Sequence, residues 1–247
     1  MNKLRSSNGR LYGVGLGPGD PDLVTIKAAK IIAAVPVVAY FAKHGAHGKA
    51  RAILDRWLAG TCIQLPLLYP LTTETHFCDP AYVGQLRGFY ADAEAAIAAH
   101  LLAGRDVALV CEGDPLFYGS FMHLYVRLKD RFPIEIVPGV TGMSGCWSAA
   151  KAPMAWGDDV LSVLPGTLGH AALVRHLGAS DAVVIIKIGA NLMKIRAAIV
   201  EAGRLSDAIY VEHGTSETEN IVPLAAKPDD QAPYFSSILI PGHGRRP

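Results

Sequence analysis

The chain has 247 residues, of which 51% are hydrophobic and 18% are charged, and its formal net charge is +1 at pH 7. This composition predicts a folded protein of one large domain or two ordinary ones, and it argues against disorder. Because the charges nearly balance and form no long run of one sign, neither nucleic acid nor an anionic membrane is expected as the main partner.

Targeting signals and cysteine spacing bear on the location of the protein. The N-terminal segment MNKLRSSNGR is polar and lacks the apolar stretch of a signal peptide. The longest apolar runs are too short, or too interrupted by proline, to span a bilayer. The four cysteines show no C-x-x-C spacing. Neither a disulfide framework nor a metal site is therefore predicted, and the expected location is cytoplasmic.

The chain is organised around its first glycine-rich stretch, Leu11 to Thr25, which reads LYGVGLGPGDPDLVT. An apolar strand start leads into alternating glycines, after which Asp20 and Pro21 suit the start of a helix. The stretch predicts a strand, a tight glycine turn and a helix over 20–33. Glycines in such a turn let a ligand or another chain segment approach the backbone closely.

Strand and helix patterns alternate through the remainder of the chain. The predicted strands cover residues 35–41, 63–68, 107–111, 134–137, 160–164, 182–188, 208–212 and 236–240. The predicted helices cover residues 50–58, 81–103, 119–129, 169–178 and 191–203, with a short helix of small residues ending near 150. The alternation predicts an α/β fold, with one α/β domain over 1–127 and a second over 128–247.

Four glycine-containing turns follow predicted strands. They lie at 13–20, 112–115, 138–142 and 212–215. In open α/β sheets ligands bind at the carboxyl ends of strands, so the four turns together suggest one ligand held largely by backbone groups. Taken singly, each turn is also explained by close packing, and Asp114 by an Asx turn that binds its own backbone.

Several catalytic signatures are absent from the sequence. Pro18 and Asp20 stand where the dinucleotide fingerprint G-x-G-x-x-G requires glycine. The phosphate loop of NTPases, the G-x-S-x-G elbow and the H-E-x-x-H zinc motif are also missing. No pair of nucleophile and base stands out. This favours a reaction in which a bound reagent carries the reactive group and the protein orients it.

A basic segment, Lys43 to Arg51, follows the second predicted strand. Its cationic side chains suit an acidic substrate, because lysine and arginine pair well with carboxylates. The alternative is a solvated loop that leads into a helix. The next long loop, 69–80, is polar and bounded by proline, and its length is typical of functional loops.

In combination these motifs resemble the tetrapyrrole methylases, the S-adenosylmethionine-dependent enzymes of the corrin and sirohaem pathways. The resemblance extends from Tyr12 to about Gly242 and rests on four motifs in order, at 13–25, 112–115, 137–141 and 211–215. Within the family, the segments 40–43, 69–74 and 111–121 are similar to the branch that methylates precorrin-2 at C20. Three alternatives remain open: a cobalt-containing substrate, another ring position, and a protein that binds a tetrapyrrole without turnover.

The resemblance implies two α/β domains with S-adenosylmethionine in a cleft between them, a homodimer, and a tetrapyrrole substrate rich in carboxylates. The residues that it places at the cofactor are Pro18, Glu112, Gly113, Asp114, Phe117, Thr141, Gly142, Ile188, Gly214 and Ser237. The candidate substrate contacts are Lys43, His44, Lys49, Arg51, Tyr69, Glu74 and Tyr118. No residue is assigned as a general base, because holding the methyl group in line with an electron-rich carbon is the main requirement of the reaction.

Overall fold

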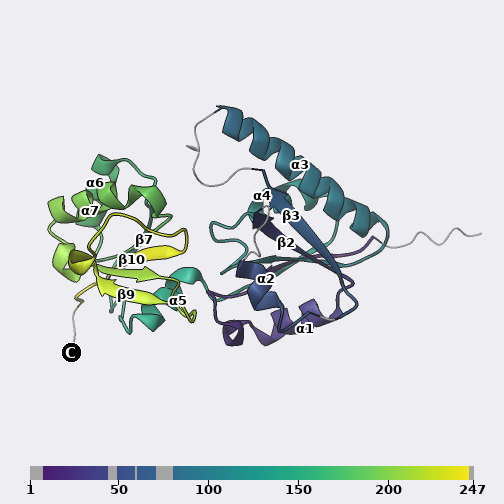
Figure 1. The fold of residues 1–247 in the computed structure, drawn as a ribbon, viewed down its shortest axis with the longest axis horizontal. Helices are drawn as coiled ribbons and strands as arrows, with labels where there is room; N and C mark the ends of the chain where they lie inside the picture. Colours follow the sequence, from purple (N-terminus) through teal and green to yellow (C-terminus); the bar gives the residue numbers. More distant parts are fainter. Residues whose placement is uncertain (1–7, 44–48, 59, 71–79, 245–247) are drawn as a thin grey trace, which may run out of the picture. The chain divides into compact units, whose positions relative to one another are not determined.

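A computed structural model describes residues 8–43, 49–58, 60–70 and 80–244. The chain forms two compact units, Met1–Thr141 and Gly142–Pro247. Each unit is an α/β structure with a five-stranded sheet of its own. The predicted α/β class is therefore confirmed (Figure 1).

The first unit contains five strands and the helices that connect them. In chain order its elements are β1 (Leu11–Gly15), η1 (Pro21–Leu23), α1 (Ile26–Ala34), β2 (Val37–Lys43), α2 (Lys49–Leu54), β3 (Ile63–Tyr69), α3 (Pro80–Leu102), β4 (Val107–Cys111), α4 (Phe121–Leu128) and β5 (Ile134–Val137). The strand order is β3-β2-β4-β1-β5, and every paired strand is parallel. The carboxyl ends of all five strands therefore lie at one edge of the sheet.

Helices cover both faces of this sheet, α3 and α4 on one and α1 and α2 on the other (Figure 1). β4 is buried along its whole length, as expected for a central parallel strand. Because side chains alternate along a strand, Leu109 packs in the α3/α4 core, and Ala108 and Val110 pack in the α1/α2 core.

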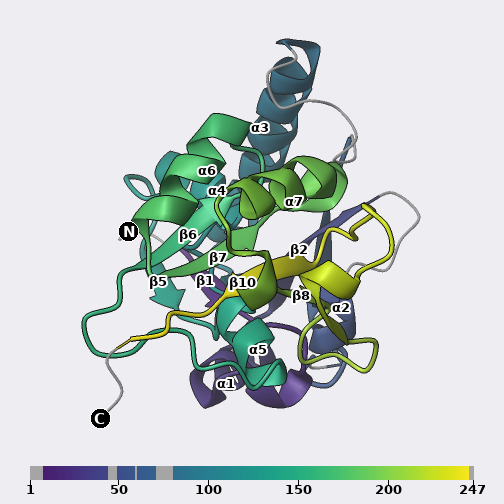
Figure 2. The ribbon, with the colours of Figure 1, turned by 90° about the vertical axis from the view of Figure 1, so that its left-hand side faces the viewer.

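The second unit is a mixed sheet with its own core. Its elements are α5 (Gly142–Ala149), β6 (Leu161–Pro165), α6 (His170–Ala179), β7 (Ala182–Ile186), η2 (Gly189–Asn191), α7 (Leu192–Glu201), η3 (Leu205–Asp207), β8 (Ile209–Glu212), β9 (Asn220–Pro223), η4 (Leu224–Ala226) and β10 (Ser236–Ile240). The order is β6-β7-β10-β8-β9; β6 and β7 are parallel, and the other pairs are antiparallel. Helices α6 and α7 pack on one face and α5 on the other (Figure 2).

The structure differs from the sequence expectations in three places. The helix predicted over 20–33 is a 3-10 turn capped by Asp20, followed by α1, which Thr25 caps at Ala28 N. Strand β9 was not predicted, because a short edge strand that ends in proline carries little strand signal. The predicted domain boundary at 127/128 precedes β5, yet β5 pairs with β1, so the first unit continues to Thr141.

The described residues lack two structural features. No helix among them is both long and apolar enough to cross a membrane. Nor do any three of their histidine, cysteine, aspartate or glutamate side chains form a group able to hold a metal ion.

Candidate functional site

The turns after β1 and β4 are joined by their backbones at the carboxyl edge of the first sheet. Gly113 N–H donates to Gly17 O at 2.7 Å, and Gly17 N–H donates to Gly113 O at 3.4 Å. Both glycines have positive φ, +79° at Gly17 and +65° at Gly113, which residues with a side chain rarely adopt. The backbone polar groups of Gly113 therefore serve this pairing.

The turn after β5 packs against the same two turns. A Cβ added at Gly15 would lie 2.5 Å from Gly139 N and 2.6 Å from Gly113 O. A Cβ added at Gly139 would overlap Gly113 O and lie 2.8 Å from Gly15 Cα. The three turns thus pack backbone against backbone. This is the close packing that the sequence analysis gave as the alternative explanation of these glycines. Together they form a compact backbone layer at the carboxyl ends of β1, β4 and β5.

Asp114 links these turns through both of its carboxylate oxygens. Oδ1 accepts a hydrogen bond from Leu116 N at 2.9 Å, and Oδ2 accepts one from Gly139 N at 3.2 Å. The first bond is the Asx turn considered from the sequence, and the second links the β4 and β5 turns. The residue as a whole is half-buried. Each oxygen retains a further lone pair for a ligand.

Glu112 has a hydrogen-bond partner that the sequence does not predict. Its Oε1 accepts a hydrogen bond from Ala50 N at 3.1 Å, in the first turn of α2. Strand alternation explains this direction, because Glu112 follows Cys111 and so faces the α1/α2 side of the sheet. The carboxylate therefore connects the β4 turn to the helix that starts in the basic segment.

The remaining predicted residues around the β1 and β4 turns are accessible. Pro18 is half-buried in the turn after β1, and Phe117 is half-buried after β4. The ring of Phe117 lies edge-on to that of Tyr118, at a centroid distance of 5.0 Å. Tyr118 is 43% exposed and has φ of +55°, an uncommon conformation for a residue with a side chain.

Tyr69 lies in an aromatic cluster at the carboxyl end of β3. Its ring stacks on Phe89 at 4.5 Å and on Phe41 at 5.6 Å. Its hydroxyl makes a short hydrogen bond to Ser120 Oγ and lies 3.4 Å from the hydroxyl of Tyr90. Ser120 stands at the N-cap of α4 without capping it, because its oxygen bonds to Tyr69 instead.

The basic segment is only partly described. Arg51 Nε donates to Gln64 Oε1 at 3.0 Å, and its guanidinium pairs with Asp55, directly after the end of α2. The backbones of Lys43 and Lys49 end β2 and begin α2. The prediction for the His44 and Glu74 side chains, and for those of the two lysines, lies outside the described residues.

In the second unit, two predicted residues meet at a cysteine. A Cβ added at Gly214 would lie 3.0 Å from Cys146 Cα and 3.1 Å from its Sγ. Burial raises the pKa of the Cys146 thiol, whereas hydrogen bonds with Ser237 and with the Gly214 backbone act to lower it. The turn after β8, strand β10 and helix α5 therefore converge on one buried thiol. The sequence patterns gave no signal for Cys146, because its partners are distant in the chain.

The remaining predicted cofactor residues, Thr141, Gly142 and Ile188, differ in their exposure to solvent. Thr141 and Gly142 stand at the end of one unit and the start of α5, where Thr141 is half-buried and Gly142 is exposed. Ile188 is fully buried in the core formed by α6, α7 and the sheet. Its apolar contact with a cofactor stays a prediction.

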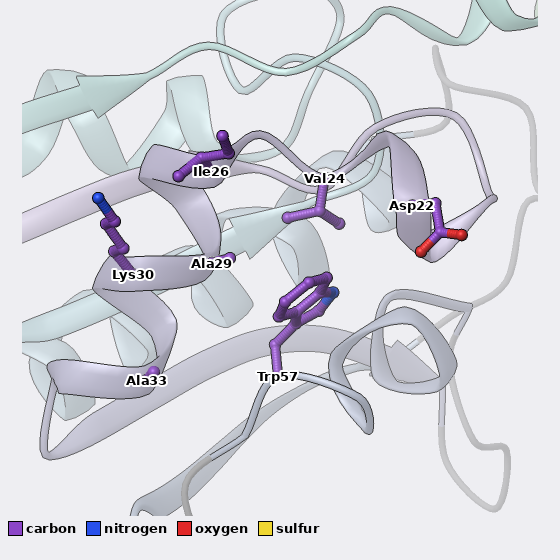
Figure 3. A pocket seen from close by; sticks show the side chains of 7 residues that line it. All are labelled: Asp22, Val24, Ile26, Ala29, Lys30, Ala33 and Trp57. Carbon is purple, nitrogen blue, oxygen red and sulfur yellow. The ribbon is translucent and has the colours of Figure 1, made fainter.

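A groove of about 470 Å³ lies elsewhere on the first unit, between α1 and Trp57 (Figure 3). It is lined by Asp22, Val24, Ile26, Ala29, Lys30, Ala33 and Trp57. The indole ring points toward Val24 and α1, so the lining is mainly apolar. No predicted cofactor or substrate residue belongs to it.

Comparisons with known proteins agree on a family. The model described as Tetrapyrrole (Corrin/Porphyrin) Methylases matches residues 10–227. A precorrin-2 C(20)-methyltransferase from Sinorhizobium sp is 55% identical over 97% of this chain and 98% of the relative. A cobalt-precorrin-2 C(20)-methyltransferase from Salmonella typhimurium is 27% identical over 94% of this chain and 96% of the relative.

The fold is also shared with a solved structure. The uroporphyrin-III C-methyl transferase of Thermus thermophilus, complexed with S-adenyl homocysteine, superposes with a TM-score of 0.66. The match covers 94% of this chain and 97% of that one, at 22% identity.

Proposed function

Because the chain belongs to the tetrapyrrole (corrin/porphyrin) methylases, we propose that it methylates precorrin-2 at C20, using S-adenosylmethionine, in cobalamin biosynthesis. The product is precorrin-3A. The observation that carries this proposal is the 55% identity, over nearly the whole of both chains, to the Sinorhizobium precorrin-2 C(20)-methyltransferase. It supports the same substrate and the same ring position more strongly than the family alone.

The described residues fit S-adenosylmethionine chemically. At the carboxyl edge of the first sheet, the half-buried residue Asp114 is held by hydrogen bonds to turns whose glycines pair through their backbones. A fixed carboxylate suits a ligand that carries an ammonium and a sulfonium group. The bound cofactor would supply an activated methyl group. The residues proposed to hold it are Pro18, Gly113, Asp114, Phe117, Thr141, Gly142, Gly214 and Ser237.

The substrate carries carboxylates on its periphery, and the proposed contacts to them are lysine and arginine side chains, which pair well with carboxylates. Lys43 is the last residue of β2, Lys49 is the first residue of α2, and Arg51 lies in the first turn of α2. The other proposed substrate contacts are His44, Tyr69, Glu74 and Tyr118. Binding at several charged points would fix the orientation of the ring, which is the condition for an in-line methyl transfer.

The protein contributes position rather than a dedicated base. Rigid backbone pairing of the glycine turns keeps Asp114 in place, and no proton transfer to a named side chain is required. Orientation of two bound reactants can supply a large part of the rate enhancement of such a reaction.

Product analysis tests this proposal directly. Purified protein is incubated with S-adenosylmethionine and metal-free precorrin-2, and the product is examined by mass spectrometry and NMR. We expect one added methyl group on C20. A methyl group on another carbon would overturn the assignment. Binding of S-adenosylhomocysteine without turnover on any precorrin would favour a non-catalytic tetrapyrrole-binding protein.

Cobalt-precorrin-2 is the second candidate substrate, supported by the Salmonella relative at 27% identity. We expect a higher kcat/KM for the metal-free substrate, because the relative named for it is twice as similar. The reverse ratio would assign the protein to the cobalt route. A homodimer in the cytoplasm is part of the same proposal, and light scattering after size exclusion tests the dimer.

A further inference from the structure

Glu112 supplies the negative charge that the start of α2 lacks. The first four amides of a helix have no partner within the helix, and a carboxylate near them is favourable. Helix α2 has no acidic residue in its own first turn. The carboxylate of Glu112, in the turn directly after β4, accepts the hydrogen bond of Ala50 N instead.

The amide that Glu112 binds lies between two proposed substrate cations. Ala50 is flanked by Lys49 and Arg51 and is only 2% exposed, so its backbone is embedded in the core. Arg51 is anchored on the other side by Gln64 of β3. The start of α2 is therefore bound to both β3 and β4, and the direction of its first turn depends on these contacts.

We infer that Glu112 is a positioning residue for the tetrapyrrole rather than a cofactor contact: by binding Ala50 N it orients the turn that carries Lys49 and Arg51. This inference rests on the proposed function for the role of the two cations. It separates Glu112 from Asp114, two residues further on, whose carboxylate bonds within the glycine turns.

The positioning itself can be measured without turnover. In Glu112→Ala, hydrogen–deuterium exchange should become faster in peptides that cover α2. In Glu112→Gln, which keeps an oxygen acceptor, exchange should stay close to that of the wild type. The matched control is Thr25→Ala, which removes the cap bond to Ala28 N and should accelerate exchange in α1 alone. Unchanged exchange over α2 in Glu112→Ala would overturn the inference.

Kinetics separates the two proposed roles of Glu112. We expect Glu112→Ala to raise KM for precorrin-2 roughly tenfold, because the displaced turn would lose about one charged hydrogen bond to the substrate. The calorimetric Kd for S-adenosylhomocysteine and kcat should change less than about twofold. Thr25→Ala should leave both constants unchanged. Glu112→Gln should restore most of the substrate affinity.

A fall in S-adenosylhomocysteine affinity equal to that in Asp114→Ala would place Glu112 at the cofactor and refute the inference. An unchanged KM would refute it as well. Failure of the proposed function has a separate signature, because the wild-type protein would then not methylate precorrin-2 at C20, whatever the exchange over α2.

Discussion

Gly113 N–H donates a hydrogen bond to Gly17 O at 2.7 Å, so the turns after β4 and β1 are joined directly through their backbones. Neither position accepts a side chain easily, because both glycines have positive φ. Gly139 packs against this pair from the β5 turn. The arrangement explains why side-chain-free residues recur at three strand ends, and it leads to the first prediction.

Gly139→Ala should destabilise the protein by roughly 1–3 kcal/mol, the usual cost of forcing extra volume into a packed site. The new Cβ would overlap Gly113 O, and a backbone carbonyl cannot move aside as a flexible side chain can. Urea unfolding measures the effect. Gly88→Ala is the control, because nothing lies within 4 Å of its added Cβ on α3. That variant should gain about 0.5–1 kcal/mol. Equal stability of the two variants would contradict the packing described.

Asp114→Ala should reduce the affinity for S-adenosylhomocysteine at least tenfold in calorimetry. The change removes the carboxylate and the two bonds that hold the β4 and β5 turns. Gly113→Val should have a similar effect, because a β-branched residue is strained at φ of +65°. The control is Asp106→Ala, which loses a comparable bond to Arg10 N at the amino end of β4. Unchanged affinity in both test variants would contradict the proposed site.

Gly214→Ala should weaken S-adenosylhomocysteine binding by a smaller factor, about three- to tenfold. The added Cβ would be 3.0 Å from Cys146 Cα, so α5 must move by a few tenths of an ångström. Stability should fall by about 1 kcal/mol for the same reason. Gly178→Ala is the control in this unit, since its added Cβ meets nothing within 4 Å. Full affinity in Gly214→Ala would show that this turn tolerates the shift or lies away from the ligand.

Stability should decline as the pH rises above about 8.5, the ordinary pKa of a cysteine thiol. Burial raises the pKa values of Cys111 and Cys146 in the folded protein. Above that pH the unfolded chain releases these protons before the folded one, so the stability contribution is complete below it and is lost as the pH rises. Each thiol then lowers the unfolding free energy by up to about 1.4 kcal/mol per pH unit.

Denaturant titrations between pH 8 and 10 test this dependence. The double variant with alanine at both buried cysteines should show a flatter decline than the wild type, even if its stability at neutral pH is lower. Cys62→Ala is the control, because Cys62 is only partly buried. A decline of the same slope in the double variant would assign the alkaline loss to other groups.

Much of the fold could be predicted from local pattern. A continuous apolar run identified β4, because a strand buried on both faces carries little polar sequence. The boundary between the units was predicted too early, since only pairing with β1 reveals that β5 completes the first sheet. The full burial of Ile188 could not be predicted from the sequence either, because burial depends on which elements pack around a residue.

The sequence by itself determined the succession of elements, the positions of the glycine turns and the membership of a family, because these depend on residue type and spacing along the chain. Only the tertiary structure decided which groups those turns bind. The Glu112 carboxylate reaches α2 and the Cys146 thiol reaches Gly214, in each case across a long stretch of chain. Hydrogen bonds and close contacts act over a few ångströms in space, and spacing in sequence does not record that distance.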